Sequence, residues 1–192
     1  MGTFTIDGGH KLKGTLTPQG AKNEALQVIC AVLLTSEPVT ICNIPNIIDV
    51  TLLIDLLVDL GVKVKHIKDG EYQFNASQID IDKLNDPAFQ RKANKLRGSV
   101  MIAGPLLARC NHSFIPKPGG DKIGRRRMDT HILGFEKLGV VSEYKQGDGF
   151  FKLSTKQLIG ADILLEEPSV TGTANIILAA VMAKGQTTIY NA

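Results

Sequence analysis

The stretch Ala31–Asn43, AVLLTSEPVTICN, and the stretch Ala180–Asn191, AVMAKGQTTIYN, share one pattern. Each begins like the apolar end of a buried helix, passes through a polar turn, and finishes as a short β-rich strand that stops at asparagine. A looser third copy is Gly104–Pro116, GPLLARCNHSFIP. The recurrence predicts a chain built from repeated helix–strand units.

A second unit recurs between these copies. Leu57–Val62, LVDLGV, matches Phe135–Val140, FEKLGV, which lies 78 residues later. Gly61 and Gly139 suit the left-handed position that closes a helix. Each is followed by a strand, a polar glycine turn and another strand, so the segment predicts a helix that leads into a hairpin.

The two units combine into one repeat: helix, strand, helix, strand, turn, strand. It occurs twice, and a third copy begins at Gly172 and stops after its first strand. Asp49 and Asp129 are predicted N-caps of the second helix of each copy. The pattern indicates an α/β domain whose helices pack together, with chance similarity of amphipathic helices as the alternative. Because an incomplete repeat leaves an apolar face uncovered, we expect this chain to be a piece of a longer protein.

Composition excludes several classes of protein. The formal charge of +3 is too small to indicate nucleic-acid binding by itself. The odd number of cysteines, without CxxC spacing, argues against a disulfide framework or zinc site and indicates a reducing cytoplasm. The longest mostly apolar run, Ala25–Leu34, is ten residues, whereas a membrane-spanning helix needs about twenty. We therefore expect a soluble, cytoplasmic protein.

A first candidate site is Gly20–Leu26, GAKNEAL. A glycine precedes a predicted helix, and Lys22 and Asn23 fall in its first turn. Backbone N–H groups at a helix start attract anions, and lysine adds a full charge. The segment predicts a phosphate or carboxylate site, with a solvated helix start capped by asparagine as the alternative.

A second candidate site is the stretch 116–131, PKPGGDKIGRRRMDTH. Its glycines permit the conformations that a mobile loop needs, and its arginines suit phosphate. Asp121 would lie among cations, which lower a carboxyl pKa, while enclosure raises it, and such opposed influences suit a proton donor. The alternatives are an exposed basic loop and a nucleic-acid contact through residues 125–127. The aromatic fraction of 5% argues against the latter, because single-strand binders use stacking rings.

A third candidate site is the stretch 166–175, EEPSVTGTAN, which precedes a predicted helix. It could hold an anion, and it is equally an ordinary capping sequence. The four histidines have no metal-ligand spacing. The sequence also contains no GxSxG, Walker or strand-linked GxGxxG motif.

Together these segments resemble the UDP-N-acetylglucosamine 1-carboxyvinyltransferase family, the enolpyruvyl transferases of the first committed step of peptidoglycan synthesis. The resemblance extends over essentially the whole chain. The matching segments are FTIDGG at 4–9, LKG at 12–14, GAKNEAL at 20–26, NIP at 43–45, IDV at 48–50, LGV at 60–62, Arg97, PGG at 118–120, IG at 123–124, and Asp129 with His131.

The resemblance implies a fold and a domain division. The family has two lobes, each an inside-out α/β barrel of three βαβαββ units around a pseudo-threefold axis, with the helices inside. Residues 1–21 would belong to the second lobe, and residues 22–192 would form the first lobe with an incomplete third unit. The missing C-terminal lobe would be a partner supplied by the same protein.

The resemblance also implies a reaction. The family transfers the enolpyruvyl group of phosphoenolpyruvate to the 3′-hydroxyl of UDP-N-acetylglucosamine and releases phosphate, by addition then elimination. The reaction needs no metal and no cofactor. The resemblance implies neither a nucleic-acid nor a membrane partner. Because further catalytic groups would lie beyond residue 192, we expect this chain alone to be inactive.

The implied site residues fall on matching positions of this sequence. Lys22 and Arg97 would hold phosphoenolpyruvate, and Asn23 would bind the sugar nucleotide. Asp121 would donate a proton to the methylene carbon, with Lys22 stabilising charge in the adduct. The remaining implied contacts are Arg126 as the loop arginine, Met128, Asp129 and Thr130 at the uridine, and Ser169, Val170 and Thr171 at the diphosphate.

Two positions depart from the family pattern. Asp121 stands where most members have cysteine, and since a carboxylate is a poor target for a thiol-alkylating epoxide, we expect resistance to fosfomycin. Glu167 stands where a lysine commonly faces the diphosphate. The alternatives to this function are the shikimate-pathway enolpyruvyl transferase, whose signature is Lys-Ser rather than Lys22-Asn23, and a non-catalytic module that binds a sugar nucleotide or RNA.

Overall fold

The computed structural model describes residues 2–116, 128–145 and 150–192. The first part of the chain folds as α1 (Lys22–Ala31), η1 (Val32–Leu34), β1 (Val39–Ile41), α2 (Ile48–Asp59), β2 (Lys63–Lys68), β3 (Glu71–Asn75), η2 (Ile81–Asn85) and α3 (Pro87–Ala93). The second part folds as η3 (Arg97–Ile102), α4 (Ala103–Cys110), β4 (His112–Ile115), α5 (Asp129–Lys137), β5 (Val141–Lys145), β6 (Phe150–Ser154), β7 (Asp162–Leu164), α6 (Val170–Ala180) and β8 (Thr188–Tyr190). The η elements are 3₁₀ helices.

The element order confirms the predicted repeat. The run α1, β1, α2, β2, β3 recurs as α4, β4, α5, β5, β6, and both copies form antiparallel sheets in which the last strand lies in the middle, in the orders β1-β3-β2 and β4-β6-β5. The third copy is α6 followed by β8. Before α6 comes β7, which pairs in parallel with β8. The predicted helix from Gly172 begins two residues earlier, at Val170.

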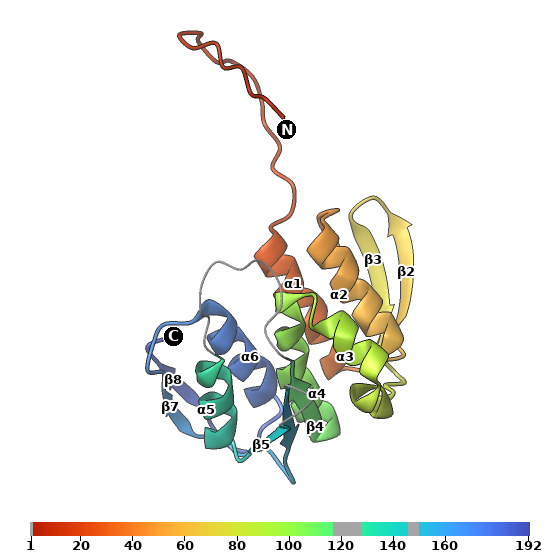
Figure 1. Cartoon of the computed structure of the whole chain (residues 1–192), viewed down its shortest axis with the longest axis vertical. Coiled ribbons are helices and arrows are strands. Elements are labelled where there is room, and N and C mark those ends of the chain that lie inside the picture. The colour runs from red at the N-terminus through yellow and green to blue at the C-terminus, as the bar shows by residue number, and fades with distance from the viewer. Residues whose placement is uncertain (1, 117–127, 146–149) are drawn as a thin grey trace.

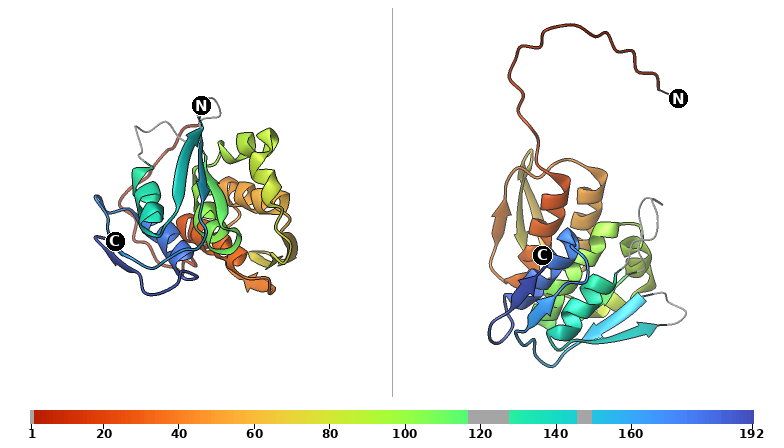
Figure 2. Two further views of the ribbon diagram at one scale, coloured as in Figure 1. Left: turned by 90° about the horizontal axis from the view of Figure 1, so that it is seen from below. Right: turned by 90° about the vertical axis from the view of Figure 1, so that its left-hand side faces the viewer.

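The helices lie inside and the sheets outside, as the resemblance implies. Figures 1 and 2 show the three sheets around the helices, with α6 between α4 and α5. The outer strand β2 is largely exposed, whereas helical side chains such as Ile29, Leu53 and Leu106 are fully buried. Burial of these apolar side chains is the main force that holds the units together.

The repeat boundaries carry the backbone conformations that the sequence predicts. Gly61 and Gly139 close α2 and α5 with φ of +94° and +89°. After β1 and β8, Asn43 and Asn191 both adopt φ of 59°, a left-handed conformation that asparagine tolerates better than most residues. The predicted strand ends and helix ends are therefore confirmed at equivalent places in different copies.

The predicted N-caps are wrong. The residue before α2 is Ile47 and the residue before α5 is Met128, and neither helix start has a side-chain cap. Asp49 and Asp129 instead lie inside the first turn. A carboxylate there still interacts favourably with the positive end of the helix dipole.

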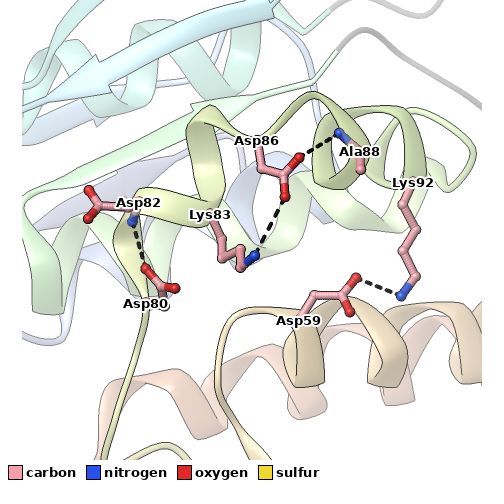
Figure 3. Close-up of polar contacts among 7 residues, drawn as sticks. All are labelled: Asp59, Asp80, Asp82, Lys83, Asp86, Ala88 and Lys92. Carbon is pink, nitrogen blue, oxygen red and sulfur yellow. Dashed lines mark hydrogen bonds and ion pairs between the residues drawn. The ribbon is translucent and has the colours of Figure 1, made fainter.

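Carboxylates do cap the helices that join the first two units (Figure 3). Asp80 accepts a hydrogen bond from Asp82 N at 3.1 Å and Asp86 from Ala88 N at 2.8 Å. The bond from Ala88 and nearby Lys83 lower the pKa of Asp86. Lys92 donates to Asp59 Oδ2 at 2.7 Å, which attaches α3 to α2. These contacts fix the segment that leads into η3.

The N-terminal residues do not join the packed body. Residues 2–20 form no helix or strand and extend away from the helices (Figures 1 and 2). Their apolar side chains are almost fully exposed, with Phe4 at 93% and Leu12 at 97%. Within the described residues, no helix has the length and apolar character needed to cross a membrane.

Candidate functional site

The first candidate site lies at the start of α1. Lys22 is the first residue of the helix, and Asn23 follows it on the exposed surface. No side chain caps this helix start, so the proposed capping role of asparagine is wrong. Lys22 Nζ lies 2.5 Å from Asp49 Oδ2, which brings the starts of α1 and α2 together. This end of the two helices presents a cation and free backbone N–H groups, the chemistry of an anion site.

Arg97 begins η3 and is half-buried. The next residue, Gly98, lies against Leu26 of α1, because a Cβ added at Gly98 would be 3.0 Å from Leu26 Cδ1. The charge of Arg97 also acts on His131 of α5. Arg97 therefore begins a segment that packs against the helix that carries Lys22, and its charge reaches the helix that carries Thr130.

The starts of α5 and α6 lie side by side. A Cβ added at Gly172 would be 2.8 Å from Thr130 Cγ2, so glycine is what permits this approach. Ser169 Oγ accepts a hydrogen bond from Gly172 N at 3.1 Å. The capping interpretation of the third candidate site is thus confirmed for Ser169. The packing also brings the predicted uridine residue Thr130 close to the predicted diphosphate stretch.

Two buried polar side chains lie behind these helix starts. Asn175 of α6 is 0% exposed and His131 is 2% exposed. Asn175 Nδ2 lies 3.1 Å from His131 Nδ1. Burial, with a smaller contribution from the charge of Arg97, lowers the pKa of His131 to about 4. At neutral pH the imidazole is therefore uncharged, and Arg97 has no cationic neighbour in His131.

A cavity of about 420 Å³ opens between α5 on one side and β7 with the segment that follows it on the other. Asp129, Thr130 and Lys137 line it from α5, and Glu166 and Glu167 line it from the other side. With three carboxylates and one lysine, its charged lining favours hydroxyl and N–H donors over a diphosphate. Ser169, Val170 and Thr171 are not part of the lining.

The structure thus brings some predicted residues together and leaves others undescribed. Arg97, Thr130 and Ser169 belong to one contiguous group of helix starts, with His131 and Gly172 between them. Met128 directly precedes α5 and is half-buried, while Val170 is exposed. Asp121 and Arg126 lie outside the described residues.

The sequence interpretation missed Asn175 as a structural centre. The only available signal was a polar amide in the otherwise apolar and small-residue run of α6, VTGTANIILAA. A buried amide of this kind needs hydrogen-bond partners, but the sequence does not show which elements supply them. Among the described residues, no three His, Cys, Asp or Glu side chains come together as a metal site.

Comparison with known proteins identifies the family. The sequence model described as EPSP synthase (3-phosphoshikimate 1-carboxyvinyltransferase) matches residues 6–192. The chain belongs to the EPSP synthase family. Within that family, it is 53% identical over its whole length to a UDP-N-acetylglucosamine 1-carboxyvinyltransferase of Bacteroides fragilis. It is 50% identical to the enzyme of that name from Porphyromonas gingivalis.

The chain spans 44% of the length of these two relatives. Solved structures of two enolpyruvyl transferases agree with the fold. The enolpyruvyl transferase NikO from Streptomyces tendae has a TM-score of 0.76 at 19% identity, with 95% of this chain and 42% of that chain covered. EPSP synthase from Acinetobacter baumannii has a TM-score of 0.67 at 17% identity, with 92% and 40% covered. These likenesses confirm the predicted enolpyruvyl transferase fold.

Proposed function

We propose that the protein to which this chain belongs transfers the enolpyruvyl group of phosphoenolpyruvate to the 3′-hydroxyl of UDP-N-acetylglucosamine, with release of phosphate. The observation that carries the proposal is the identity of 50–53% with relatives that bear this activity as their name, over all 192 residues. The reaction would be the first committed step of peptidoglycan synthesis, in the cytoplasm.

Phosphoenolpyruvate would bind between Lys22 and Arg97. Both are cations at the starts of helical segments, and α1 and η3 are in contact. A doubly charged phosphate and a carboxylate are well matched by one lysine, one arginine and the free N–H groups of a helix start. Asn23, exposed beside Lys22, would bind the sugar nucleotide.

The sugar nucleotide would extend along the starts of α5 and α6. Met128, Asp129 and Thr130 would contact the uridine, and Ser169, Val170 and Thr171 the diphosphate. The charged groups of the nearby cavity indicate which parts of the sugar nucleotide would lie in it. The carboxylates of Asp129, Glu166 and Glu167 suit uridine and sugar donors, whereas the diphosphate would be held by backbone N–H groups at the start of α6.

The proton chemistry would come from Asp121. Addition of the 3′-hydroxyl to phosphoenolpyruvate requires a proton at the methylene carbon, and a carboxylic acid can donate it. Arg126 would hold anionic substrate from the same segment. Both assignments rest on the sequence, since neither residue lies among those that the structure describes.

Residues 1–21 would pack in a second lobe supplied by the rest of the protein, and residues 22–192 would form the first lobe. The almost complete exposure of Phe4, Ile6, Leu12 and Leu16 supports this division, because water-exposed apolar side chains of this size are normally covered. The second lobe would add further catalytic groups, so the 192-residue chain alone would be inactive.

The test is release of inorganic phosphate by the full-length protein that carries this segment. With phosphoenolpyruvate and UDP-N-acetylglucosamine together, we expect multiple turnovers and an enolpyruvyl product of the sugar nucleotide in mass spectrometry. Replacement of the sugar nucleotide by shikimate 3-phosphate should give none. Turnover with shikimate 3-phosphate instead would assign the protein to the other activity of its family.

A further inference from the structure

Asn175 bonds to three different segments through one side-chain amide. Its Oδ1 accepts a hydrogen bond from Gly104 N at 2.8 Å, its Nδ2 donates to Val100 O at 2.9 Å, and the same Nδ2 faces His131 Nδ1 at 3.1 Å. The two backbone partners fix the orientation of the amide, because an N–H can only donate and a carbonyl can only accept. All polar atoms of a fully buried side chain are thereby used.

The two backbone partners lie at a junction between helix types. η3 ends at Ile102 and α4 begins at Ala103. Val100 O and Gly104 N are four residues apart, so they are the pair that would bond to each other in a continuous α-helix. The amide of Asn175 bonds to both groups instead, while Val100 O also accepts the 3₁₀ hydrogen bond of Ala103 N. Insertion of a side chain into the helical ladder is a recognised cause of a bend.

Close packing holds the amide in this position. A Cβ at Gly104 would overlap the backbone carbonyl of Asn175 and would lie 2.6 Å from its Oδ1. A Cβ at Gly134 of α5 would likewise overlap Ile176 on the neighbouring turn of α6. Figure 1 shows α6 between α4 and α5. Because glycine allows contact on both sides, α6 has little freedom to shift the amide.

The third partner defines the state of His131. Both Nδ2 hydrogens of Asn175 point to acceptors, one to Val100 O and the other to His131 Nδ1. Nδ1 must therefore carry no proton, and the neutral ring carries its proton on Nε2. A doubly protonated ring would set Nδ1–H against Nδ2–H. The amide thus keeps an uncharged imidazole next to Arg97, whose charge acts on that ring.

We propose that Asn175 is a positioning residue for Arg97: its amide fixes the 3₁₀ turn that starts at Arg97 and holds His131 as a neutral neighbour of the guanidinium. The inference rests on the proposed function, in which Arg97 binds phosphoenolpyruvate. It adds a buried residue of the third repeat, which lies behind the helix starts, to the group that determines affinity for that substrate.

The kinetic test compares two substitutions on α6 in the full-length protein. Asn175→Leu keeps the size of the side chain and removes all three hydrogen bonds. Thr173→Val is the matched control, since Thr173 Oγ1 is buried without a hydrogen-bond partner in the described part of the chain. We expect Asn175→Leu to raise KM for phosphoenolpyruvate about 10- to 100-fold, because displacement of a positioning group by about 1 Å has effects of this size. KM for UDP-N-acetylglucosamine should stay within about twofold of the control.

A purely structural role would lower the melting temperature and the yield of active protein while leaving both KM values at those of Thr173→Val, and that result overturns the proposal. A second measurement uses the wild-type protein, so it does not depend on whether a variant folds. Nitrogen-15 NMR of histidine-labelled wild-type protein at neutral pH should show His131 unprotonated at Nδ1 and protonated at Nε2. The opposite tautomer, or a charged ring, overturns the proposal. If the wild-type protein releases no phosphate, the proposed function fails, and the tautomer in that same sample still decides whether the Asn175 network exists.

Discussion

Lys22 at the start of α1 forms an ion pair with Asp49 at the start of α2, with Nζ 2.5 Å from Oδ2. Each repeat copy places a polar or charged residue in the first turn of a helix. In this copy, the opposite charges of two such residues neutralise each other. The pair is partly exposed, with side-chain exposures of 44% and 37%. An exposed pair of this kind contributes little to stability. Its main consequence is that an incoming anion must share Lys22 with a carboxylate.

Removal of that carboxylate should strengthen anion binding. In the full-length protein, we expect Asp49→Asn to lower Kd for phosphoenolpyruvate about 1.5- to 5-fold, which corresponds to the usual range for an exposed ion pair. Calorimetric titration measures the change. Asp59→Asn, which removes the Lys92 ion pair on the far end of α2, is the control and should leave Kd unchanged. Weaker binding in Asp49→Asn would mean that Asp49 orients Lys22 rather than competing for it.

The contact between α5 and α6 should depend on Gly134. Gly134→Ala places a Cβ on Ile176, which is fully buried, so we expect a loss of about 1–3 kcal/mol in the free energy of unfolding. Ile176→Val alone should cost about 0.5–1.5 kcal/mol. Because the smaller side chain makes room for the new methyl, the double variant should lose less than the sum of the two. Denaturant titration of all four proteins tests this, and strict additivity would contradict the contact.

The buried His131 should make stability depend on pH. Its pKa is lowered from 6.5 to about 4 in the folded protein. Below pH 6.5 the unfolded chain therefore binds a proton that the folded protein does not. Stability is fully present above pH 6.5 and falls as the pH drops towards 4, by about 3 kcal/mol for this group.

The comparison that isolates this effect is wild type against His131→Gln, measured by denaturant titration at several pH values. The difference in the free energy of unfolding should change between pH 6.5 and 4 and stay constant above pH 7. Parallel curves across the whole range would show that His131 is not buried in the neutral form.

Asp121 should make the protein insensitive to a thiol-alkylating epoxide. After incubation with fosfomycin, wild-type protein should carry no adduct at position 121, and Asp121→Cys should carry one, because the thiolate is the nucleophile that opens the epoxide. Peptide mass spectrometry distinguishes this site from Cys42, which is exposed. An adduct on Asp121 of the wild-type protein would contradict the prediction.

The repeated architecture could be predicted from sequence because it depends on local signals. Glycine at the ends of α2 and α5 and asparagine after β1 and β8 mark conformations that few other residues adopt. The N-caps at Asp49 and Asp129 were predicted wrongly for a related reason. A carboxylate near a helix start is favourable in the first turn as well as at the cap, so composition alone does not separate the two positions.

The candidate site was predictable only in part. Lys22 and Ser169 lie at helix starts, where the sequence motifs place them. The network around Asn175 was not predictable, because its partners lie far away along the chain. Gly104 is 71 residues from Asn175, Val100 is 75 residues away, and His131 is 44 residues away. Contacts between residues so far apart depend on how whole units pack. Gly104 and Gly134 permit this packing, but their contacts with α6 are visible only in the folded structure.

We propose that a carboxylic acid at position 121 donates the proton for enolpyruvyl transfer, between helix starts that would bind the anionic substrates. The most direct test of this proposal is the rate of phosphate release from phosphoenolpyruvate and UDP-N-acetylglucosamine by full-length wild-type protein and by Asp121→Ala. The account predicts turnover in the wild type and a loss of about 10²- to 10⁴-fold in kcat for the variant, the range expected for removal of a general acid. An alanine variant that turns over as fast as the wild type would contradict it.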